Sequence, residues 1–162
     1  MITSKEEVYD ILHQININFT VSKHLPAFTI DEMKELSIKH VDHIPKNLFV
    51  RDGKKNYYLI IVRQDKKVNL KKLRDTIHCS RLSFASEDDL YSLLGLKKGS
   101  VSPAGLFNDI EGKVNVVVDK DLWSLEFVGI HPNFNDATIW ISVDDLMKIC
   151  HYHQNTVIVE TL

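Results

Sequence analysis

The chain has 162 residues and a mass of 18.7 kDa, which is the length of one domain. Hydrophobic residues make up 44% of it and aromatic residues 9%, so the chain can bury an ordinary core, and disordered and low-complexity proteins are excluded. A net charge of −2 over the whole chain indicates neither a nucleic-acid partner nor a membrane partner. We expect one domain spanning residues 1–162.

Two features indicate the cellular compartment. The first residues, MITSKEEVYD, lack the basic and apolar segments of a signal peptide, and no apolar run reaches the roughly 18 residues that span a bilayer. Cys79 and Cys150 lie far apart with no CxxC pair, as expected for free thiols in a reducing compartment. We expect a cytoplasmic protein with no membrane partner.

The first part of the chain predicts two helices and a strand. Ser4 begins a capping box followed by apolar residues at helical spacing, which predicts a helix over residues 5–15. A short strand is expected over residues 19–23. Thr29 begins a second capping box, so a second helix is expected after it.

The middle of the chain predicts a β-hairpin. Residues 47–51 and 57–62 are rich in β-branched and aromatic side chains, and DGKKN at 52–56 joins them. Gly53 is expected to adopt a positive φ in this turn.

A helix–strand–helix segment is predicted next. Asn69 can cap a basic helix that reaches about residue 77, and residues 82–84 predict a short strand. Ser86 begins a helix with acidic residues in its first turn, and Gly95 is expected to end it.

The last part predicts mainly strands. Ser142 can cap a helix that reaches Cys150. The predicted strands are residues 113–119, 125–129, 137–141 and 156–159. Helices and strands therefore interleave without a linker or repeat, which predicts an α+β domain with a mixed sheet.

Positive charge is concentrated in one window. Residues 46–74 contain ten basic and two acidic side chains, although the whole chain is slightly acidic. Clustered cations of this kind are typical of a surface that contacts phosphates. An ordinary solvated face is the alternative that charge alone leaves open.

Motifs for several reaction classes are absent. The sequence has no GxSxG, GxxxxGK[ST], GxGxxG or HExxH, so nucleotide hydrolysis and hydride transfer lose their usual support. The histidine pairs His40/His43 and His151/His153 have no Cys, Asp or Glu at ligand spacing. We interpret them as surface histidines and expect neither a metal nor a cofactor.

Three segments carry polar or irregular features that suit a site. Residues 99–105 contain two glycines and a proline, and such backbone can aim N–H groups at an oxyanion or form only a turn. Residues 130–138 are a turn rich in hydrogen-bonding groups, or simply a capped hairpin. Lys46 follows a proline at the mouth of a strand, where a solvent-facing side chain is the plainer interpretation.

Four stretches, in this order, are more specific together than any one of them. They are HLPAFTIDEMKEL (24–36), KNLFVRDGKKNYYLIIVRQDKKVNLKKLR (46–74), LSFASEDDLYSLLGLKKGSVSPAGLFND (82–109) and HPNFNDATIWISVDDL (131–146). Over nearly the whole chain they resemble the prolyl-tRNA editing family, free-standing deacylases similar to the editing insertion of bacterial prolyl-tRNA synthetase. RLSFAS and GSVSPAGL look closest to single-domain members that hydrolyse alanine wrongly attached to proline tRNA.

The resemblance implies an α+β domain with a mixed, partly closed central β-sheet wrapped by helices. It also implies site residues, with Lys46 matching the family's key lysine and residues 99–105 its glycine–proline loop near the scissile ester. The implied catalytic residues are Lys46, Gly99, Ser100, Val101, Ser102, Pro103, Ala104 and Gly105. The implied substrate-binding residues are Phe28, Thr29, Asn47, Leu48, His131, Asn135 and Thr138. The expected tRNA contacts are Lys54, Lys55, Arg63, Lys66, Lys67, Lys71 and Lys72.

The implied activity is hydrolysis of mischarged Ala-tRNA(Pro), with prolyl-tRNA synthetase as a second partner. An aminoacyl ester is already activated, so a positioned water and oxyanion donors suffice without a covalent nucleophile. Relatives often carry a bulkier apolar residue at Ala104 and Thr at Asp136, so the resemblance leaves the exact size of the pocket open. A deacylase for serine, cysteine or 2-aminobutyrate, and a non-catalytic module that binds aminoacyl-tRNA or a synthetase, stay open as alternatives.

Overall fold

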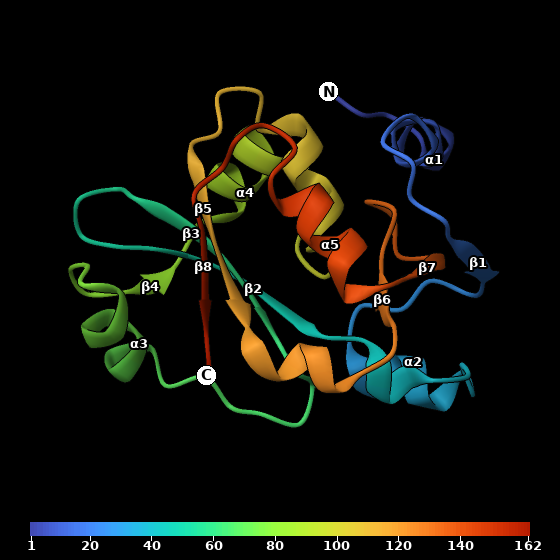
Figure 1. The fold of residues 1–162 in the computed structure, drawn as a ribbon, viewed down its shortest axis with the longest axis horizontal. Helices are drawn as coiled ribbons and strands as arrows, with labels where there is room; N and C mark the ends of the chain where they lie inside the picture. Colours follow the sequence, from blue (N-terminus) through green and yellow to red (C-terminus); the bar gives the residue numbers. More distant parts are fainter.

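Two sheets pack around a shared core in the computed structural model, which describes residues 1–162 (Figure 1). The three-stranded sheet has the order β1–β7–β6 and the five-stranded sheet the order β4–β2–β3–β5–β8. The strands are β1 (Thr20–Lys23), β2 (Lys46–Arg51), β3 (Tyr57–Val62), β4 (Ser83–Phe84), β5 (Val114–Asp119), β6 (Val128–Ile130), β7 (Ala137–Ile141) and β8 (Val157–Glu160). The helices are α1 (Lys5–Gln14), α2 (Ile30–Glu35), α3 (Leu70–Ile77), α4 (Glu87–Leu94) and α5 (Val143–Cys150), with 3-10 helices η1 (Val41–His43), η2 (Pro103–Asn108) and η3 (Lys120–Ser124).

The expected α+β class with a mixed sheet is confirmed, but the single central sheet is divided in two. The five-stranded sheet is mixed, because β2 pairs antiparallel with β3 and β4 while β5 pairs parallel with β3 and β8. The small sheet is antiparallel throughout. Apolar faces of both sheets contribute to one cluster of 24 buried residues, so side-chain burial and not strand pairing joins them.

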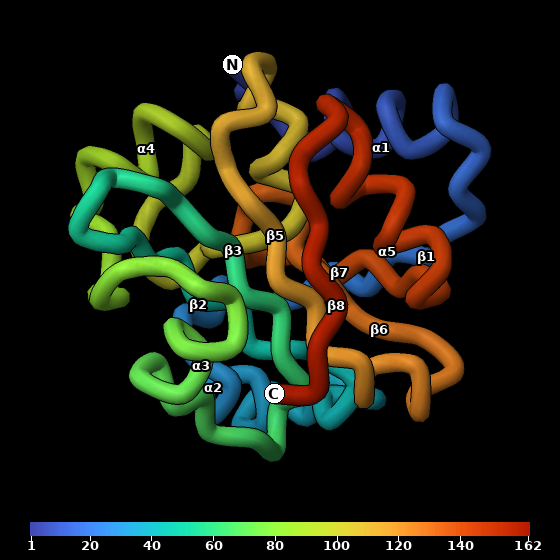
Figure 2. Tube along the Cα trace, turned by 60° about the vertical axis from the view of Figure 1, so that its left-hand side comes forward, coloured from blue at the N-terminus to red at the C-terminus, as the bar shows by residue number.

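Strands β3 and β5 form the centre of the large sheet and are covered on both faces. Leu59 and Ile61 of β3 point into the main core, whereas Ile60 and Val62 point into a second cluster that includes Leu73 of α3. This explains why β3 is a continuous apolar run without alternation. Figure 2 shows β3, β5 and β8 side by side, with β8 at the edge of the sheet.

Local capping signals predicted the helix starts correctly. A side chain at each N-cap accepts a hydrogen bond from the backbone N–H three residues further on, as is usual for Ser, Thr and Asn at this position. These caps are Ser4, Thr29, Asn69, Ser86 and Ser142. Gly95 ends α4 in the left-handed conformation, as expected.

The hairpin between β2 and β3 is confirmed, but the prediction of a positive φ at Gly53 is wrong. The left-handed residue is Lys55, with φ 62°. The buried Asp52 carboxylate accepts hydrogen bonds from the N–H groups of Lys54 and Asn56. These bonds organise the turn, so Gly53 does not need the left-handed conformation.

The predicted strand over residues 125–129 is shorter than expected. Leu125 ends η3, and its N–H donates to Leu122 O at 3.0 Å. Strand β6 therefore begins only at Val128.

No helix of the structure combines the length and apolar character that crossing a membrane requires.

A buried carboxylate joins the end of β5 to the loop after β3. Asp119 is fully buried and accepts hydrogen bonds from Lys66 Nζ at 2.9 Å and from the Arg63 N–H at 3.0 Å. Burial alone would raise the pKa of this carboxyl, but the hydrogen bonds from Lys66 and from backbone N–H groups outweigh burial and hold the pKa below its usual value.

Replacing Asp119 by Asn is expected to lower the free energy of unfolding by about 1.5–3 kcal/mol, because Lys66 loses its buried counter-charge and keeps only the partly exposed Asp121. The depressed pKa stabilises the folded state above the unfolded-state pKa of about 3.9, and this contribution disappears as the pH falls through the folded-state pKa. Denaturant unfolding of both proteins between pH 3 and 7 measures the effect.

Asp65→Asn is the matched control, because Asp65 pairs with Arg63 at the surface and is 65% exposed. It is expected to cost at most about 1 kcal/mol. Equal losses in the two variants would contradict a structural role for the buried pair.

Candidate active site

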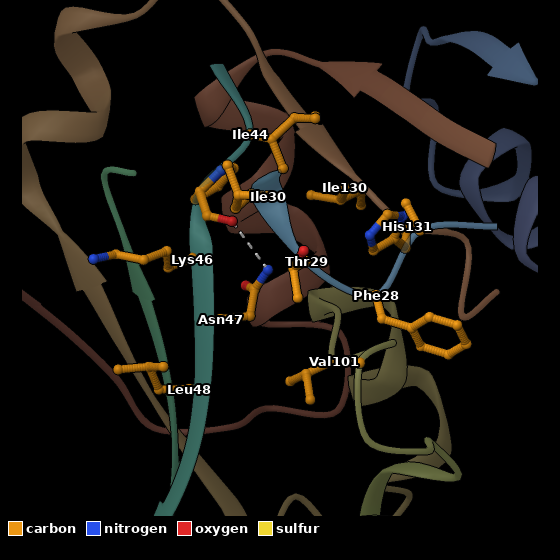
Figure 3. Close-up of a pocket in the computed structure, with 14 residues that line it drawn as sticks. Phe28, Thr29, Ile30, Ile44, Lys46, Asn47, Leu48, Val101, Ile130 and His131 are labelled. Atoms are coloured by element: carbon orange, nitrogen blue, oxygen red, sulfur yellow. Dashed lines mark hydrogen bonds between the residues drawn. The ribbon is translucent and has the colours of Figure 1, made fainter. Parts of the chain in front are cut away.

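A cavity of about 250 Å³ lies where four segments distant in sequence meet (Figure 3). The segments are the start of α2, the start of β2, the loop before η2, and the end of β6. The lining residues are Ala27, Phe28, Thr29, Ile30, Ile44, Pro45, Lys46, Asn47, Leu48, Gly99, Val101, Gly129, Ile130 and His131. The structure thus brings eight of the predicted site residues into one cavity.

Strand β2 aims its side chains to alternate sides at the cavity wall. Lys46 and Leu48 extend from one side of the strand, and Asn47 extends from the other, towards Thr29 and Val101 (Figure 3). This follows from the two-residue period of a strand. Lys46 makes no ion pair and no side-chain hydrogen bond, so its positive charge, which lies on the side of the strand away from Asn47, is available to a ligand (Figure 3).

The amide of Asn47 is incompletely hydrogen-bonded. Its Nδ2 atom lies 3.5 Å from Pro45 O, the limit for a hydrogen bond, and its Oδ1 atom is buried without a partner. A buried polar atom without a partner costs free energy. Such an atom at a cavity wall therefore marks a position where a ligand can supply the missing donor.

Phe28 and Gly99 close one side of the cavity. Gly99 has φ 84°, and a Cβ atom there would lie 2.7 Å from Phe28 Cδ1. Glycine is thus required both by the backbone and by the close approach of the phenyl ring. Phe28 is 60% exposed, and its N–H donates to Glu32 in the cap of α2, which holds the backbone in place.

The segment predicted as a loop of converging N–H groups is in part a 3-10 helix. Ser102 is fully buried, and its hydroxyl donates to His131 O at 2.5 Å and accepts from the Ala104 N–H at 3.2 Å. Of residues 99–105, only Gly99 and Val101 line the cavity. The Ser102–Gly105 stretch is buried and supports the His131 turn from behind.

The hydrogen bonds of His131 define its tautomer. Its Nδ1 atom lies 3.1 Å from Ala137 O, and a carbonyl oxygen only accepts, so Nδ1 carries the proton. Burial lowers the pKa of His131 below its usual value. The neutral ring on the wall opposite Asn47 (Figure 3) therefore offers its second nitrogen as an acceptor.

Two predicted substrate-binding residues lie outside this cavity. Thr138 is fully buried in β7, and its hydroxyl lies 2.9 Å from His24 Nε2. Asn135 and Ser100 line a neighbouring cavity of about 310 Å³ on the far side of Phe28. The cavity is also lined by three apolar residues that were not predicted as site residues, namely Ile30, Ile44 and Ile130. In the sequence, an apolar residue that lines a cavity looks the same as one that packs in the core.

The predicted tRNA contacts divide into free and paired cations. Lys66 is bound to Asp119 and Asp121, and Arg63 is bound to Asp65. The exposed side chains of Lys54, Lys55, Lys67, Lys71 and Lys72 make no ion pair and no side-chain hydrogen bond. These five residues form two groups, one on the β2–β3 hairpin and one in α3 and the loop before it, and together they are called the basic face below.

The histidine pairs are not part of a metal cluster. No three Cys, His, Asp or Glu side chains lie together in a way that suits a metal ion. His40 and His43 pack against Phe127 with ring centroids 5.0 and 4.4 Å from it. His153 lies 3.0 Å from Phe107 O.

A family model and individual known proteins match this chain to the same group of sequences. Residues 24–149 match the aminoacyl-tRNA editing domain. The chain is 46% identical over 154 residues to the prolyl-tRNA editing protein ProX of Acetoanaerobium sticklandii, covering 94% of each chain. It is 32% identical to the prolyl-tRNA synthetase associated domain-containing protein 1 of Danio rerio, covering 96% of this chain and 85% of that one.

Comparison with solved structures supports the fold. A protein proposed to be a trans-editing enzyme for prolyl tRNA synthetase superposes with a TM-score of 0.76 at 19% identity, covering 100% of this chain and 98% of that one.

The tautomer of His131 can be measured directly. Long-range ¹⁵N–¹H NMR spectra at pH 7 are expected to show a neutral ring with the proton on Nδ1, and protonation of the second nitrogen only below the usual histidine pKa of about 6.5. His131→Ala identifies the signals. A doubly protonated ring at pH 7, or a proton on Nε2, would contradict the assigned hydrogen bond.

Proposed function

The chain belongs to the aminoacyl-tRNA editing domain family, and from this membership we propose that it is a trans-editing deacylase that hydrolyses Ala-tRNA(Pro) and spares Pro-tRNA(Pro). The observation that carries the proposal is the small cavity lined by Lys46 and His131, in which the lysine has no acidic partner and the neutral histidine offers an acceptor on the wall. The cavity lies in the segments that match the family.

The lining of the cavity suits direct attack by water. It contains no serine or cysteine that could form an acyl-enzyme. In the reaction, a water oxygen bonds to the ester carbonyl carbon, the bond to the ribose oxygen breaks, and that oxygen receives a proton. The second nitrogen of His131 can accept a hydrogen bond from the water or from the substrate ammonium group.

Lys46 is assigned an electrostatic role. A lysine ammonium group donates hydrogen bonds and has no lone pair to accept a proton, so it acts as a cation and not as a general base. Its charge suits the phosphate of the substrate or the negative charge that develops on the ester carbonyl oxygen. That charge is greatest in the transition state, so the lysine contributes mainly to turnover.

Acyl selection follows from the size of the cavity and the rigidity of its walls. Ile30, Ile44 and Ile130 form apolar walls, and Ile44 and Ile130 are almost completely buried. A synthetase site built for proline rejects alanine weakly, because a missing methylene is worth only about 1–3 kcal/mol. A second site with rigid walls excludes the larger residue more steeply, because overpacking forces its neighbours out of place.

We infer that the basic face contacts tRNA and that prolyl-tRNA synthetase is a partner. The basic face combines five exposed cations from the β2–β3 hairpin and from α3 with its preceding loop. Such a surface binds phosphates without reading sequence.

Lys46→Ala is expected to slow alanine release from Ala-tRNA(Pro) about 10²- to 10³-fold, as removal of one electrostatic donor does in other hydrolases. The measurement is release of labelled alanine under single-turnover conditions, with Pro-tRNA(Pro) as the substrate that the wild type should spare.

Lys148→Ala is the charge-matched control, because Lys148 is exposed on α5 and pairs only with Asp145. It is expected to keep wild-type turnover. Similar cleavage of alanyl and prolyl esters by the wild type would overturn the size argument, and no release from any small aminoacyl ester would favour a binding module.

Removing charge from the basic face is expected to weaken tRNA binding and its salt dependence together. For Lys67→Ala/Lys71→Ala/Lys72→Ala, the slope of log K against log salt should fall by up to about 2–3, since each phosphate contact contributes about 0.7–0.9. Filter binding of uncharged tRNA(Pro) between 50 and 300 mM salt gives the slopes. An unchanged slope would place the tRNA elsewhere.

A further inference from the structure

A second cavity of about 500 Å³ adjoins the candidate active site and has no role in the proposed hydrolysis. It shares Asn47, Leu48 and Val101 with the first cavity, so the two are separated by one wall. Phe84 and Lys98 lie on its rim and are exposed. It is called the edge cavity below.

The floor of the edge cavity is an unpaired strand edge. Strand β4 pairs only with Val50 and Arg51 of β2, and one further bond joins the Ala85 N–H to Phe49 O at 3.0 Å. Successive residues of a strand point their backbone groups to opposite sides, so Asn47 faces the same side as Phe49. Beyond Ala85 the chain turns into α4, which leaves the N–H and C=O of Asn47 without a strand partner.

Side chains on both faces of the sheet flank this edge. Phe84 pairs directly with Val50 and therefore lies on the same face as Leu48. Leu90 and Val101 line the cavity from the α4 side. A flat ring that enters in the plane of the sheet thus meets apolar groups above and below. Phe84 is 65% exposed although it is large and apolar, as expected for a stacking surface.

We propose that the edge cavity binds the adenine ring of the 3′-terminal adenosine of the aminoacyl-tRNA, while the acyl group occupies the first cavity. Adenine presents an N6–H donor beside a ring-nitrogen acceptor. This pair complements one C=O and one N–H on the same residue, which is what the outward edge of Asn47 supplies. The inference rests on the proposed function, because it identifies the nucleoside end of the same substrate.

The remaining groups suit the rest of the nucleotide. Asn47 Oδ1 has no partner at the shared wall, where the ribose hydroxyls would lie between base and ester. Lys98 provides a cation for the phosphate that precedes the adenosine, whereas Glu87 lines the cavity with the opposite charge. We therefore place the phosphate at the Lys98 end.

The first test uses adenosine 5′-monophosphate, which carries the base, the ribose and one phosphate. NMR titration of the full-length protein is expected to shift the amide signals of Asn47 and Ala85. Phe84→Ala should weaken binding about 5- to 150-fold, the range measured for loss of one base-stacking residue. Its unfolding transition controls for folding, and the exposed position of Phe84 makes a large change there unexpected.

Inosine 5′-monophosphate tests the hydrogen bonds separately from stacking. Its base presents an acceptor in place of N6–H and a donor in place of the N1 acceptor, so in the orientation that adenine takes each group would face a backbone group of its own kind at Asn47. The wild type is therefore expected to bind inosine monophosphate more weakly than adenosine monophosphate. Equal binding of the two nucleotides would overturn the assigned edge contacts.

Two control variants test the other cavities that expose aromatic side chains. His40 lines a cavity of about 620 Å³ with Phe127 and Trp140, and Phe134 lines the cavity beyond Phe28. His40→Ala and Phe134→Ala are expected to leave adenosine monophosphate binding unchanged. A loss in either variant, with Phe84→Ala unaffected, would move the base to that cavity and refute the proposal.

Turnover separates this inference from the proposed function. Phe84→Ala is expected to raise KM for Ala-tRNA(Pro) more than it lowers kcat, because stacking acts on substrate and transition state alike. A wild type that binds the nucleotide in the edge cavity but releases no alanine would refute the function and keep the nucleotide site. A wild type that releases alanine while the nucleotide binds elsewhere would refute only the site.

Discussion

Burial of the central strand pair is the constraint from which the rest of the structure follows. β3 and β5 run parallel, and side chains on both of their faces are removed from water. Parallel pairs need cover on both sides, so α3 covers one face, and η2, α4, α5 and the small sheet cover the other. β2 is next to this pair and is still held in register by β3, but only two of its residues are paired with β4.

The site occupies the place where this regular pairing ends. Lys46, Asn47 and Leu48 lie on a strand that is rigid along one edge and open along the other. Gly99 and His131 reach the same place from segments that are fixed by buried hydrogen bonds, above all that from Ser102 to His131 O. The walls of this cavity are attached to the core, and the adjoining edge cavity leaves the backbone groups of Asn47 free for a ligand.

The charged side chains divide into those paired within the scaffold and those free to contact a substrate. The acidic partners of Arg63 and Lys66 hold those cations in the scaffold, and Lys46 and the basic face are left without acidic partners. The neutral His131 adds no repulsion towards a substrate ammonium group. Hydrolysis of an activated ester requires mainly positioning and electrostatic stabilisation of the developing negative charge, which suits a cavity whose lining contains no serine or cysteine.

Local signals in the sequence determined the helix starts, the hairpin and the class of fold. Ser86 and Ser142 act within one turn of themselves, so their effect could be predicted from neighbours in the chain. Eight of the residues that the resemblance implied, Lys46 and His131 among them, line one cavity. The conformation of Gly53 was predicted wrongly, because the hydrogen bonds of the Asp52 carboxylate organise that turn. The 3-10 helix after Ser102 was missed, because the Ser102 hydroxyl is held by the distant carbonyl of His131.

Only the tertiary structure decided which groups stay free. Lys66 and Lys67 are neighbours with the same chemistry. Lys66 forms an ion pair with Asp119, which lies more than fifty positions away in the sequence, whereas Lys67 has no acidic partner. The open edge at Asn47 likewise depends on where β4 stops against β2. Pairing over such distances is set by the shape into which the whole core packs, and no local pattern of residues encodes it.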